Sequence, residues 1–474
     1  MIAVRPIFFL IVATSSLFAA ASRASADDGP NIEIWAENPW YWSDRGEPVL
    51  LLGGSDDDNL FQWPEADLIA QLDRIAAAGG NVIRNTMSDR KDKGFEEYPF
   101  GRRADGKYDL DTWNDEYWTR FERLLSETAA RRIFVQIEIW DRFDYVDNGG
   151  DERWQIHPYN PANNVNYTYE ASGFEPRYPD HPGANRQPFF FTTPKQRNNT
   201  VVLRYQERFV AKLLEHSLAY GHVLYCMDNE TSGEEEWGAY WAEFVRERAA
   251  ERGRKVHLTE MWDDWDLRAD RHRRTFDHPE RYDFVDVSQN NQNKGQEHWD
   301  NFLFVREYLS SRPRPMNTTK TYGADRNKLG HTDQDGIERF WRHLLAGAAS
   351  MRFHRPDSGL GINDKAVAAI RAARKLESLI PLWSVEPANE LLGERDDDEA
   401  YLAAAPGTAY AMYFPAGGEV TLDLASVDGT FDLRWIDIAT GEWGPTAQLT
   451  GGARRSIAPP TDGNWGAAIV RRDR

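Results

Sequence analysis

The residues of this sequence that are best placed to do chemistry lie in VLYCMDNETSG, residues 223–233. An apolar run there ends in the acidic, amide-bearing tip Asp228-Asn229-Glu230. At the end of a buried strand, a glutamate such as Glu230 can transfer a proton, whereas at the start of a surface helix it would only favour the helix dipole. The apolar run before the tip favours a functional role for Glu230.

The elements that would position Glu230 form a repeating unit of strand, polar tip and amphipathic helix, starting at about residue 48. Eight such units in succession are typical of a (β/α)8 TIM barrel, so we predict an α/β fold of this kind. A doubly wound open sheet is the rival, but it usually carries a glycine-rich phosphate turn after its first strand, and this sequence has none there. The predicted strands are PVLLLGG (48–54), NVIRNT (81–86), RIFVQIEIWD (132–141), HVLYCMDNE (222–230), KVHLTEMW (255–262), YDFVDVSQ (282–289), RPMNTTKTYG (314–323) and ASMRFHR (349–355).

Composition divides the chain into three parts. Residues 1–26 combine Arg5, an apolar run and the small residues ASA, which predicts a signal peptide cleaved near Ala26 and a secreted or periplasmic protein. The barrel is predicted over 30–395. Over 398–474, short segments of alternating apolar residues, such as VTLDL at 420–424, predict a small all-β sandwich. The aromatic-rich segment 141–200 lacks helical periodicity and is either a lid over the barrel mouth or an insertion packed away from it.

Polar residues at the strand ends are the candidate site, because active sites of such barrels form where strands end and the following loops begin. We predict Glu230 and Glu260 as the catalytic carboxyl groups. A structural ion pair is the alternative for Glu260, and tight-turn hydrogen bonds are the alternative for Asp57 and Asp58. The candidate substrate-binding residues are Asp57, Asp58, Asn59, Arg84, Asn85, Glu138, Trp140, Asp141, Asn229, Trp262, Asp263, Gln289, Asn290, Lys320, Tyr322, His354 and Arg355.

Carboxylates, amides and aromatic residues that converge without a Cys/His cluster point to cleavage of glycosidic bonds. That reaction needs one protonated carboxyl group and a second carboxylate, and aromatic rings suit the C–H faces of sugars. A serine hydrolase would need Gly-x-Ser-x-Gly and a zinc peptidase His-Glu-x-x-His, and neither motif occurs. We predict no metal and no cofactor. Lys320, His354 and Arg355 are also candidates for binding an acidic group of the substrate.

Asn229-Glu230 after a fourth barrel strand resembles the Asn-Glu signature of the large clan of retaining glycoside hydrolases with (β/α)8 barrels. That resemblance implies that Glu230 is the general acid/base and that Asn229 binds the sugar 2-hydroxyl. More narrowly, the acidic tip after strand one, AGAA at 346–349 and the segment 409–443 resemble the apiosidase-like barrel family, whose members end in a small domain of the collagen-binding type. The resemblance implies a hydrolase of poly- or oligosaccharides.

One departure concerns strand seven, where the clan places its nucleophilic glutamate and this sequence has Thr319 or Lys320. Three explanations stay open. Glu260, Glu138 or Asp263 supplies the second carboxyl group; or the mechanism is inverting, with carboxyl groups roughly 6.5–9.5 Å apart; or the chain is a non-catalytic relative that binds glycans.

The net charge of −20 limits the classes of molecule that the protein is expected to bind. Nucleic acids and anionic membranes attract basic surfaces, so we predict a carbohydrate partner, no nucleic acid and no membrane. The single cysteine, Cys226, lies in an apolar strand and cannot form an intramolecular disulfide. The sequence gives no indication of the oligomeric state.

Overall fold

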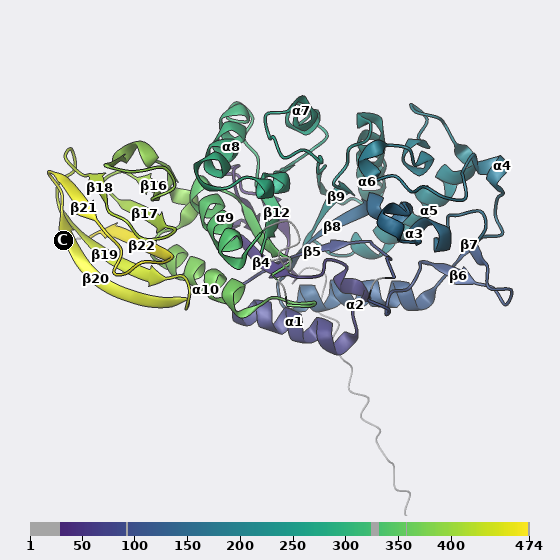
Figure 1. The fold of residues 1–474 in the computed structure, drawn as a ribbon, viewed down its shortest axis with the longest axis horizontal. Coiled ribbons are helices and arrows are strands. Elements are labelled where there is room, and N and C mark those ends of the chain that lie inside the picture. The colour runs from purple at the N-terminus through teal and green to yellow at the C-terminus, as the bar shows by residue number, and fades with distance from the viewer. Residues whose placement is uncertain (1–28, 92, 324–330, 357, 473–474) are drawn as a thin grey trace, which may run out of the picture.

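The computed structural model describes residues 29–472, apart from 92, 324–330 and 357. The predicted signal peptide, 1–26, lies outside the described residues. Eight parallel strands run through the centre of the molecule, and Figure 1 shows helices surrounding them, with a separate group of strands at the C-terminal end.

The eight predicted barrel strands are all present, which confirms the (β/α)8 architecture. They pair in the order β10-β9-β8-β5-β4-β13-β12-β11. The ring closes where the backbone N–H of Asp283, just before β11, donates to Leu258 O of β10 at 2.9 Å. The strands are β4 (Leu51–Ser55), β5 (Val82–Thr86), β8 (Phe134–Asp141), β9 (Val223–Asn229), β10 (His257–Thr259), β11 (Val285–Asp286), β12 (Met316–Tyr322) and β13 (Ser350–His354).

A helix follows each barrel strand and turns its apolar face to the sheet, as the 3.6-residue periodicity predicts. In α9, for example, the side chain of Thr332 and that of Asp335 cap each other's backbone N–H groups, and Gly347 ends the helix at φ 89°. The helices are α1 (Glu65–Ala77), α2 (Asp115–Ala130), α5 (Thr200–Ser217), α6 (Glu235–Glu251), α7 (Asp270–Phe276), α8 (Gly295–Tyr308), α9 (Asp333–Ala346) and α10 (Asp364–Leu379).

A small antiparallel sheet of β1 (Ile32–Ile34), β2 (Trp42–Asp44) and β3 (Glu47–Val49) closes the bottom of the barrel. The buried ring of Trp42 packs edge-on against His257 and Phe284, and its indole N–H donates to Asn317 Oδ1 at 2.9 Å. Because this end is sealed, the site must lie at the opposite end, where the strands finish.

The segment between β8 and α5 carries short helices, and most of it packs outside the barrel. Its rings join those of the helix layer: Phe189 lies 5.5 Å from Trp140, and Phe190 lies 5.1 Å from Trp237 of α6, between ring centroids. Only part of the segment reaches the mouth, through Arg142 and residues near 185. The expectation of a lid over the barrel mouth therefore fits only the part of the segment that reaches the mouth. Its elements are η2 (Arg142–Tyr145), η3 (Asn148–Gly150), α3 (Arg153–Ile156), α4 (Tyr169–Ser172), η4 (Pro182–Ala184) and η5 (Pro188–Phe191).

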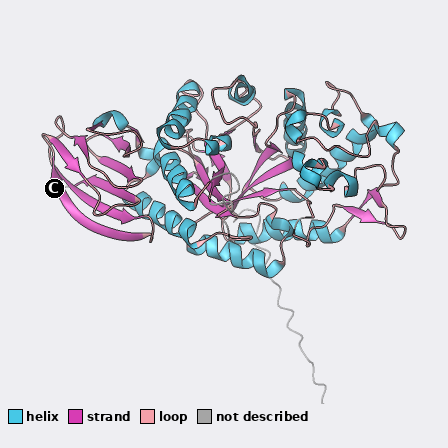
Figure 2. Ribbon diagram, in the orientation of Figure 1, coloured by secondary structure: helices cyan, strands magenta, loops and turns pink. Residues whose placement is uncertain are grey.

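The C-terminal part forms two antiparallel sheets with a hydrophobic core of their own, as predicted for a β-sandwich (Figure 2). Val420, Leu422 and Leu424 are fully buried in that core. The boundaries 30–395 and 398–474 stay a prediction. One sheet contains β14 (Glu386–Pro387), β16 (Tyr401–Ala405), β17 (Ala409–Phe414), β22 (Trp465–Arg471), β19 (Thr430–Asp437) and β20 (Glu442–Thr450); the other contains β15 (Leu392–Gly393), β18 (Val420–Asp423) and β21 (Arg454–Ile457).

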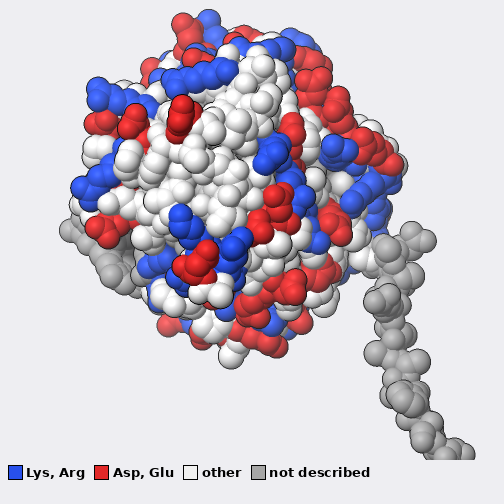
Figure 3. Space-filling view, turned by 90° about the vertical axis from the view of Figure 1, so that its right-hand side faces the viewer, with Lys and Arg blue, Asp and Glu red and all other residues white. Residues whose placement is uncertain are grey.

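Figure 3 shows a face of the molecule on which charged side chains of both signs are mixed and surround a broad uncharged area. No helix within the described residues is long and apolar enough to cross a membrane.

Candidate active site

Glu230 lies directly after β9, at the mouth of the barrel, with 18% of its side chain exposed. Its backbone has φ 53°, a left-handed conformation that is uncommon outside glycine and is often retained at functional sites. Glu230 Oε1 lies 2.5 Å from Lys320 Nζ and accepts a 2.9 Å hydrogen bond from Gln289 Nε2. Residues from strands four and seven and from the loop after strand six thus meet at one carboxylate.

The charge state of Glu230 follows from these contacts. Burial alone would raise the pKa of Glu230, but the ammonium group of Lys320 and the hydrogen bonds from Lys320 and Gln289 lower it to about 2. Glu230 is therefore ionised at neutral pH in this site. A general acid must carry a proton, so the geometry disfavours the acid role that the clan resemblance implies and favours a nucleophile or base.

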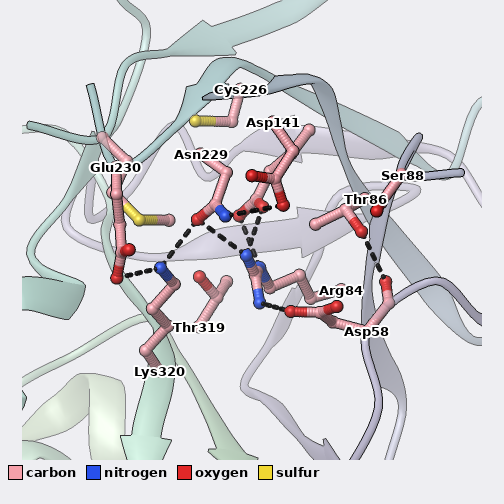
Figure 4. Close-up of polar contacts among 12 residues, drawn as sticks. Asp58, Arg84, Thr86, Ser88, Asp141, Cys226, Asn229, Glu230, Thr319 and Lys320 are labelled. Atoms are coloured by element: carbon pink, nitrogen blue, oxygen red, sulfur yellow. Dashed lines mark hydrogen bonds and ion pairs between the residues drawn. The ribbon is translucent and has the colours of Figure 1, made fainter. Parts of the chain in front are cut away.

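Asn229 connects Glu230 to the rest of the mouth, as Figure 4 shows. Its Oδ1 accepts hydrogen bonds from Lys320 Nζ at 2.7 Å and from Arg84 Nη2 at 2.9 Å, and its Nδ2 donates to Asp141 Oδ2 at 3.0 Å. These contacts fix the orientation of the amide. Among the described residues, no hydrogen bond takes up its second N–H.

Arg84 of β5 is fully buried and holds two carboxylates. Its Nε and Nη2 donate to Glu138 at 2.6 and 2.5 Å, and its Nη1 lies 2.5 Å from Asp58 Oδ2. Burial raises the pKa of Glu138, which the Arg84 guanidinium opposes, and the arginines around Asp58 lower the pKa of that carboxyl against the effect of burial. With both oxygens bound to Arg84, Glu138 is part of the frame of the site.

A second arginine, Arg90, ties the loop after β5 to the end of β8. Its Nη2 lies 2.7 Å from Asp141 Oδ2, and its Nε lies 2.9 Å from Asp144 Oδ1. Burial, followed by the charge of Asp141, raises the pKa of Asp144 well above its usual range. Sequence reasoning placed Asp141 here but missed Arg90 and Asp144, because Arg90 lies in a loop and Asp144 in the short helix η2, both beyond the strand ends.

Irregular strand ends decide which side chains face the mouth. Glu138 and Asp141 both face inward although they are three residues apart, so the two-residue alternation of β8 slips between them. In β12 the pairing with β13 shifts register between Thr318 and Thr321, a bulge-like irregularity. Inward-facing Thr319 is followed by inward-facing Lys320 for this reason.

The slip in β8 also decides the direction of the Trp140 side chain. Its ring lies 5.3 Å from Trp241 and 5.9 Å from Trp237, both in α6, and it is 1% exposed. Trp140 is thus in the helix layer, and the prediction that it binds substrate is not supported. Trp262 is equally buried: its indole donates to Thr275 Oγ1 at 2.8 Å.

Glu260 also faces away from the mouth. Its Oε1 accepts hydrogen bonds from the backbone N–H of Asp228 at 3.0 Å and of Met261 at 3.2 Å. Its Oε2 lies so close to Gly238 of α6 that a Cβ there would come within 2.1 Å. Burial and the neighbouring Asp228 raise the pKa of Glu260 well above its usual range. This placement makes Glu260 a structural group between β10 and α6 instead of the second catalytic carboxyl.

Asp263, three residues beyond Glu260, is a carboxyl group whose pKa depends on the charge of Glu230. Burial and then the negative charge of Glu230 raise the pKa of Asp263, which Lys320 partly opposes. The loop is held by backbone hydrogen bonds: Asp263 N–H donates to Thr231 O, and Thr231 N–H donates to Met261 O, both at 2.8 Å. The half-buried Asp263 thus carries a proton more readily than Glu230 does.

Two further predicted residues have structural contacts outside the mouth. Asn85 Oδ1 accepts from the backbone N–H of Phe61 at 3.0 Å, and Asn290 Nδ2 donates to His298 O at 2.9 Å. Asp57 Oδ1 accepts from the backbone N–H groups of Asp58 and Asn59 in the turn after β4. The turn-forming alternative considered for Asp57 therefore matches its geometry, and Asn59 lies in the same turn.

The rim after β12 and β13 contains Tyr322, His354 and Arg355. The ring of Tyr322 packs edge-on against His354 at 4.9 Å, and the Arg355 guanidinium carbon lies 5.8 Å from the Tyr322 centroid. Burial, followed by the charge of Glu230, raises the pKa of Tyr322, and burial and the surrounding cations hold the pKa of His354 well below its usual range.

Besides Arg90, two further arginines of the site were missed by sequence reasoning. Arg352 lies on the same face of β13 as His354, two residues away, so strand alternation could have found it. Arg142 Nε lies 3.0 Å from Asp228 Oδ2, and its Nη1 donates to Asn185 Oδ1 at 2.7 Å. No sequence signal marks the pairing with Asn185, because it joins the inserted segment to the end of β9. Among the described residues, no group of three His, Cys, Asp or Glu is arranged to hold a metal ion.

Comparison with known proteins agrees with this architecture. No protein-family profile and no curated protein matches the sequence. Solved structures do match: a glycoside hydrolase family 5 protein from Bacteroides vulgatus has a TM-score of 0.60 at 12% identity, covering 93% of this chain and 94% of that one. A protein described as a glycoside hydrolase has a TM-score of 0.60 at 11% identity, covering 94% of this chain and 98% of that one. At such low identity the likeness concerns the fold, a (β/α)8 barrel followed by β sheets.

Proposed function

We propose that this protein is a glycoside hydrolase of poly- or oligosaccharides, with Glu230 and Asp263 as its catalytic carboxyl groups. The observation that carries the proposal is that the surroundings of the two groups shift their pKa values in opposite directions. Lys320 and Gln289 keep Glu230 ionised, whereas burial and the charge of Glu230 favour the protonated form of Asp263. A pair of carboxyl groups whose environments push their pKa values apart is what acid-assisted cleavage of a glycosidic bond requires.

In this proposal Asp263 donates its proton to the leaving oxygen. Glu230, as the carboxylate, attacks the sugar carbon or activates water. Asn229 holds a sugar hydroxyl with its remaining N–H, which agrees with the role that the clan resemblance implies. Lys320 keeps Glu230 ionised and occupies the strand-seven position where the clan has its nucleophile.

The names of the similar structures support the hydrolase proposal, since two proteins sharing nearly the whole architecture are described as glycoside hydrolases. Membership of the apiosidase-like family, with a C-terminal domain of the collagen-binding type, is a narrower proposal that rests on the sequence resemblance. Export through the leader at 1–26 is likewise a proposal that rests on the sequence.

The test is release of reducing ends from a panel of plant, fungal and bacterial polysaccharides. We expect Glu230→Gln and Asp263→Asn each to lower kcat by at least about 100-fold, as is typical when an acid or base is removed. Glu236→Gln, an exposed glutamate of α6, is the matched control and should leave the rate unchanged.

The pH profile separates the two roles. Asp263 must be protonated, so activity should fall as the pH rises through its raised pKa, and Asp263→Asn should abolish that limb. If folded Glu230→Gln and Asp263→Asn proteins kept full activity on a substrate of the wild type, the proposed pair would be wrong.

A second candidate is a glycan-binding protein without turnover. The specific observation in its favour is the Lys320–Glu230 ion pair, which places a cation where the clan has a catalytic carboxylate. Saturable binding of a glycan without release of reducing ends, unaffected by Glu230→Gln, would support this candidate.

A further inference from the structure

The end of β13 brings two arginines to one side of the barrel mouth. Phe353 faces the helix layer, where its ring stacks on Phe340 of α9 at 4.6 Å. Its neighbours Arg352 and His354 therefore face the barrel interior, and Arg352 Nη1 lies 3.1 Å from His354 Nδ1. Arg355 follows at the rim.

Arg352 is fully buried, and no carboxylate among the described residues binds it. Its guanidinium donates to neutral oxygens: Thr319 O at 2.9 Å, Ser55 O at 3.3 Å and the backbone O of Asp57 at 3.4 Å, with a further contact to Ser55 Oγ. Burial, followed by the nearby charge of Arg84, lowers the pKa of Arg352 to about 9. A buried cation without a carboxylate in direct contact is costly, and here only the more distant charges of Asp58, Glu138 and Asp57 offset that cost.

Arg355, which is half-buried, is the second cation of the mouth without a carboxylate in direct contact among the described residues. Its backbone N–H donates to Ser55 O at 3.2 Å and its φ is 52°, so the chain holds it in the left-handed region. Within the described part of the chain, its guanidinium contacts the face of Tyr322 and makes no hydrogen bond or ion pair. The other cations of the mouth differ: Arg84, Arg90 and Lys320 each touch at least one carboxylate.

The charged groups that face the two arginines leave this excess in place. Asp58 and Glu138 bind Arg84 directly. The charges of Asp58, Glu138 and Asp57 also favour the charged form of Arg352, and those of Asp58 and Glu230 favour that of Arg355. His354 stays neutral, because burial and the charges of Arg355 and Arg352 keep its pKa well below its usual range. His354 thus offers hydrogen bonds without adding charge.

We propose that Arg352, His354, Arg355 and Tyr322 form a subsite for an anionic substituent of the saccharide, the carboxylate of a uronic acid or a sulfate ester. This inference rests on the proposed function and narrows its substrate class. The guanidinium of Arg355 has paired N–H donors that match two oxygens of such an anion, whereas the Nη donors of Arg352 already bind protein oxygens and His354, so Arg352 contributes its positive charge. A neutral sugar at this position would leave both guanidinium groups without an anion in direct contact.

Isothermal titration calorimetry can test the subsite with pairs of oligosaccharides that differ only in charge. One pair is oligogalacturonate and its fully methyl-esterified form, and the other is a sulfated carrageenan oligosaccharide and its desulfated form. We expect at least one anionic form to bind about 10- to 100-fold more tightly than its neutral partner, as one or two charge-assisted hydrogen bonds would give. Preference for the uronate or for the sulfate identifies the anion.

Variants test whether the preference for the anionic oligosaccharide depends on this side of the mouth. Arg355→Gln should reduce the preference for the anionic form by about 10-fold or more, and Arg355→Lys should retain part of it, because the charge remains and the paired donors are lost. Arg454→Gln removes an arginine of β21 whose side chain is 70% exposed, and it should bind like the wild type.

Equal affinity for charged and neutral partners in both pairs, or an unchanged preference in folded Arg355→Gln protein, would overturn the subsite. Neither outcome depends on turnover. Failure of the proposed hydrolase function appears separately, as reducing-end release that Glu230→Gln and Asp263→Asn do not affect.

Discussion

Replacement of Lys320 by methionine tests the electrostatic basis of the site. Lys320 Nζ lies 2.5 Å from Glu230 Oε1, and both partners are largely buried, with 2% and 18% of their side chains exposed. Each unit of pKa is worth about 1.36 kcal/mol, so a Glu230 pKa lowered from 4.5 to about 2 corresponds to about 3 kcal/mol in favour of the ionised form. Lys320→Met should therefore destabilise the protein by about 3 kcal/mol at pH 7.

The stability difference between the wild type and Lys320→Met should depend on pH, and its direction of change can be worked out. In the wild type the pKa of Glu230 is lowered on folding, so its contribution is complete above about pH 4.5 and is lost as the pH falls toward 2. In Lys320→Met, burial dominates and the pKa of Glu230 should rise above 4.5, so this carboxyl group destabilises the variant as the pH increases. The stability difference between the two proteins should thus shrink from pH 7 to pH 3.

Urea unfolding of the wild type, Lys320→Met, Glu230→Gln and the double variant measures this directly. The double-mutant cycle isolates the Lys320–Glu230 term from the hydrogen bond between Lys320 and Asn229. Lys212→Met, which removes a partly exposed lysine 3.0 Å from Glu215, should cost at most about 1 kcal/mol. A coupling energy near zero at pH 7, or a difference that does not change with pH, would refute the reasoning.

Two further predictions test side chains that the structure places outside the mouth. Glu260→Gln should change stability by less than about 1.5 kcal/mol and leave kcat within about twofold, because the raised pKa of Glu260 shows that its surroundings favour a neutral side chain. Urea unfolding and reducing-end release measure the two effects. Loss of activity in a stably folded variant would contradict this prediction. Trp140→Ala should lower the free energy of unfolding by about 3–5 kcal/mol, since it empties a fully buried aromatic cluster. Calorimetric unfolding measures this cost, and an unchanged midpoint would show that the ring is not packed as described.

The sequence by itself determined the architecture. Each strand–helix unit is a local pattern of apolar spacing, and eight of them in succession leave few folds other than a barrel, so all eight strands could be predicted. The alternation of Val420, Leu422 and Leu424 likewise identified the core face of β18. The sequence also placed Asn229, Glu230, Gln289 and Lys320 at strand ends or in the loops that follow them, where they meet.

Only the tertiary structure decided which way the strand-end residues face. Glu260 and Trp140 point to the helix layer and Lys320 to the mouth, because the two-residue alternation fails at the ends of β8 and β12 and because Gly238 of α6 leaves space for the Glu260 carboxylate. The charge of Glu230 depends on Lys320, a residue 90 positions away, and such pairings arise from the closure of the barrel rather than from any local pattern.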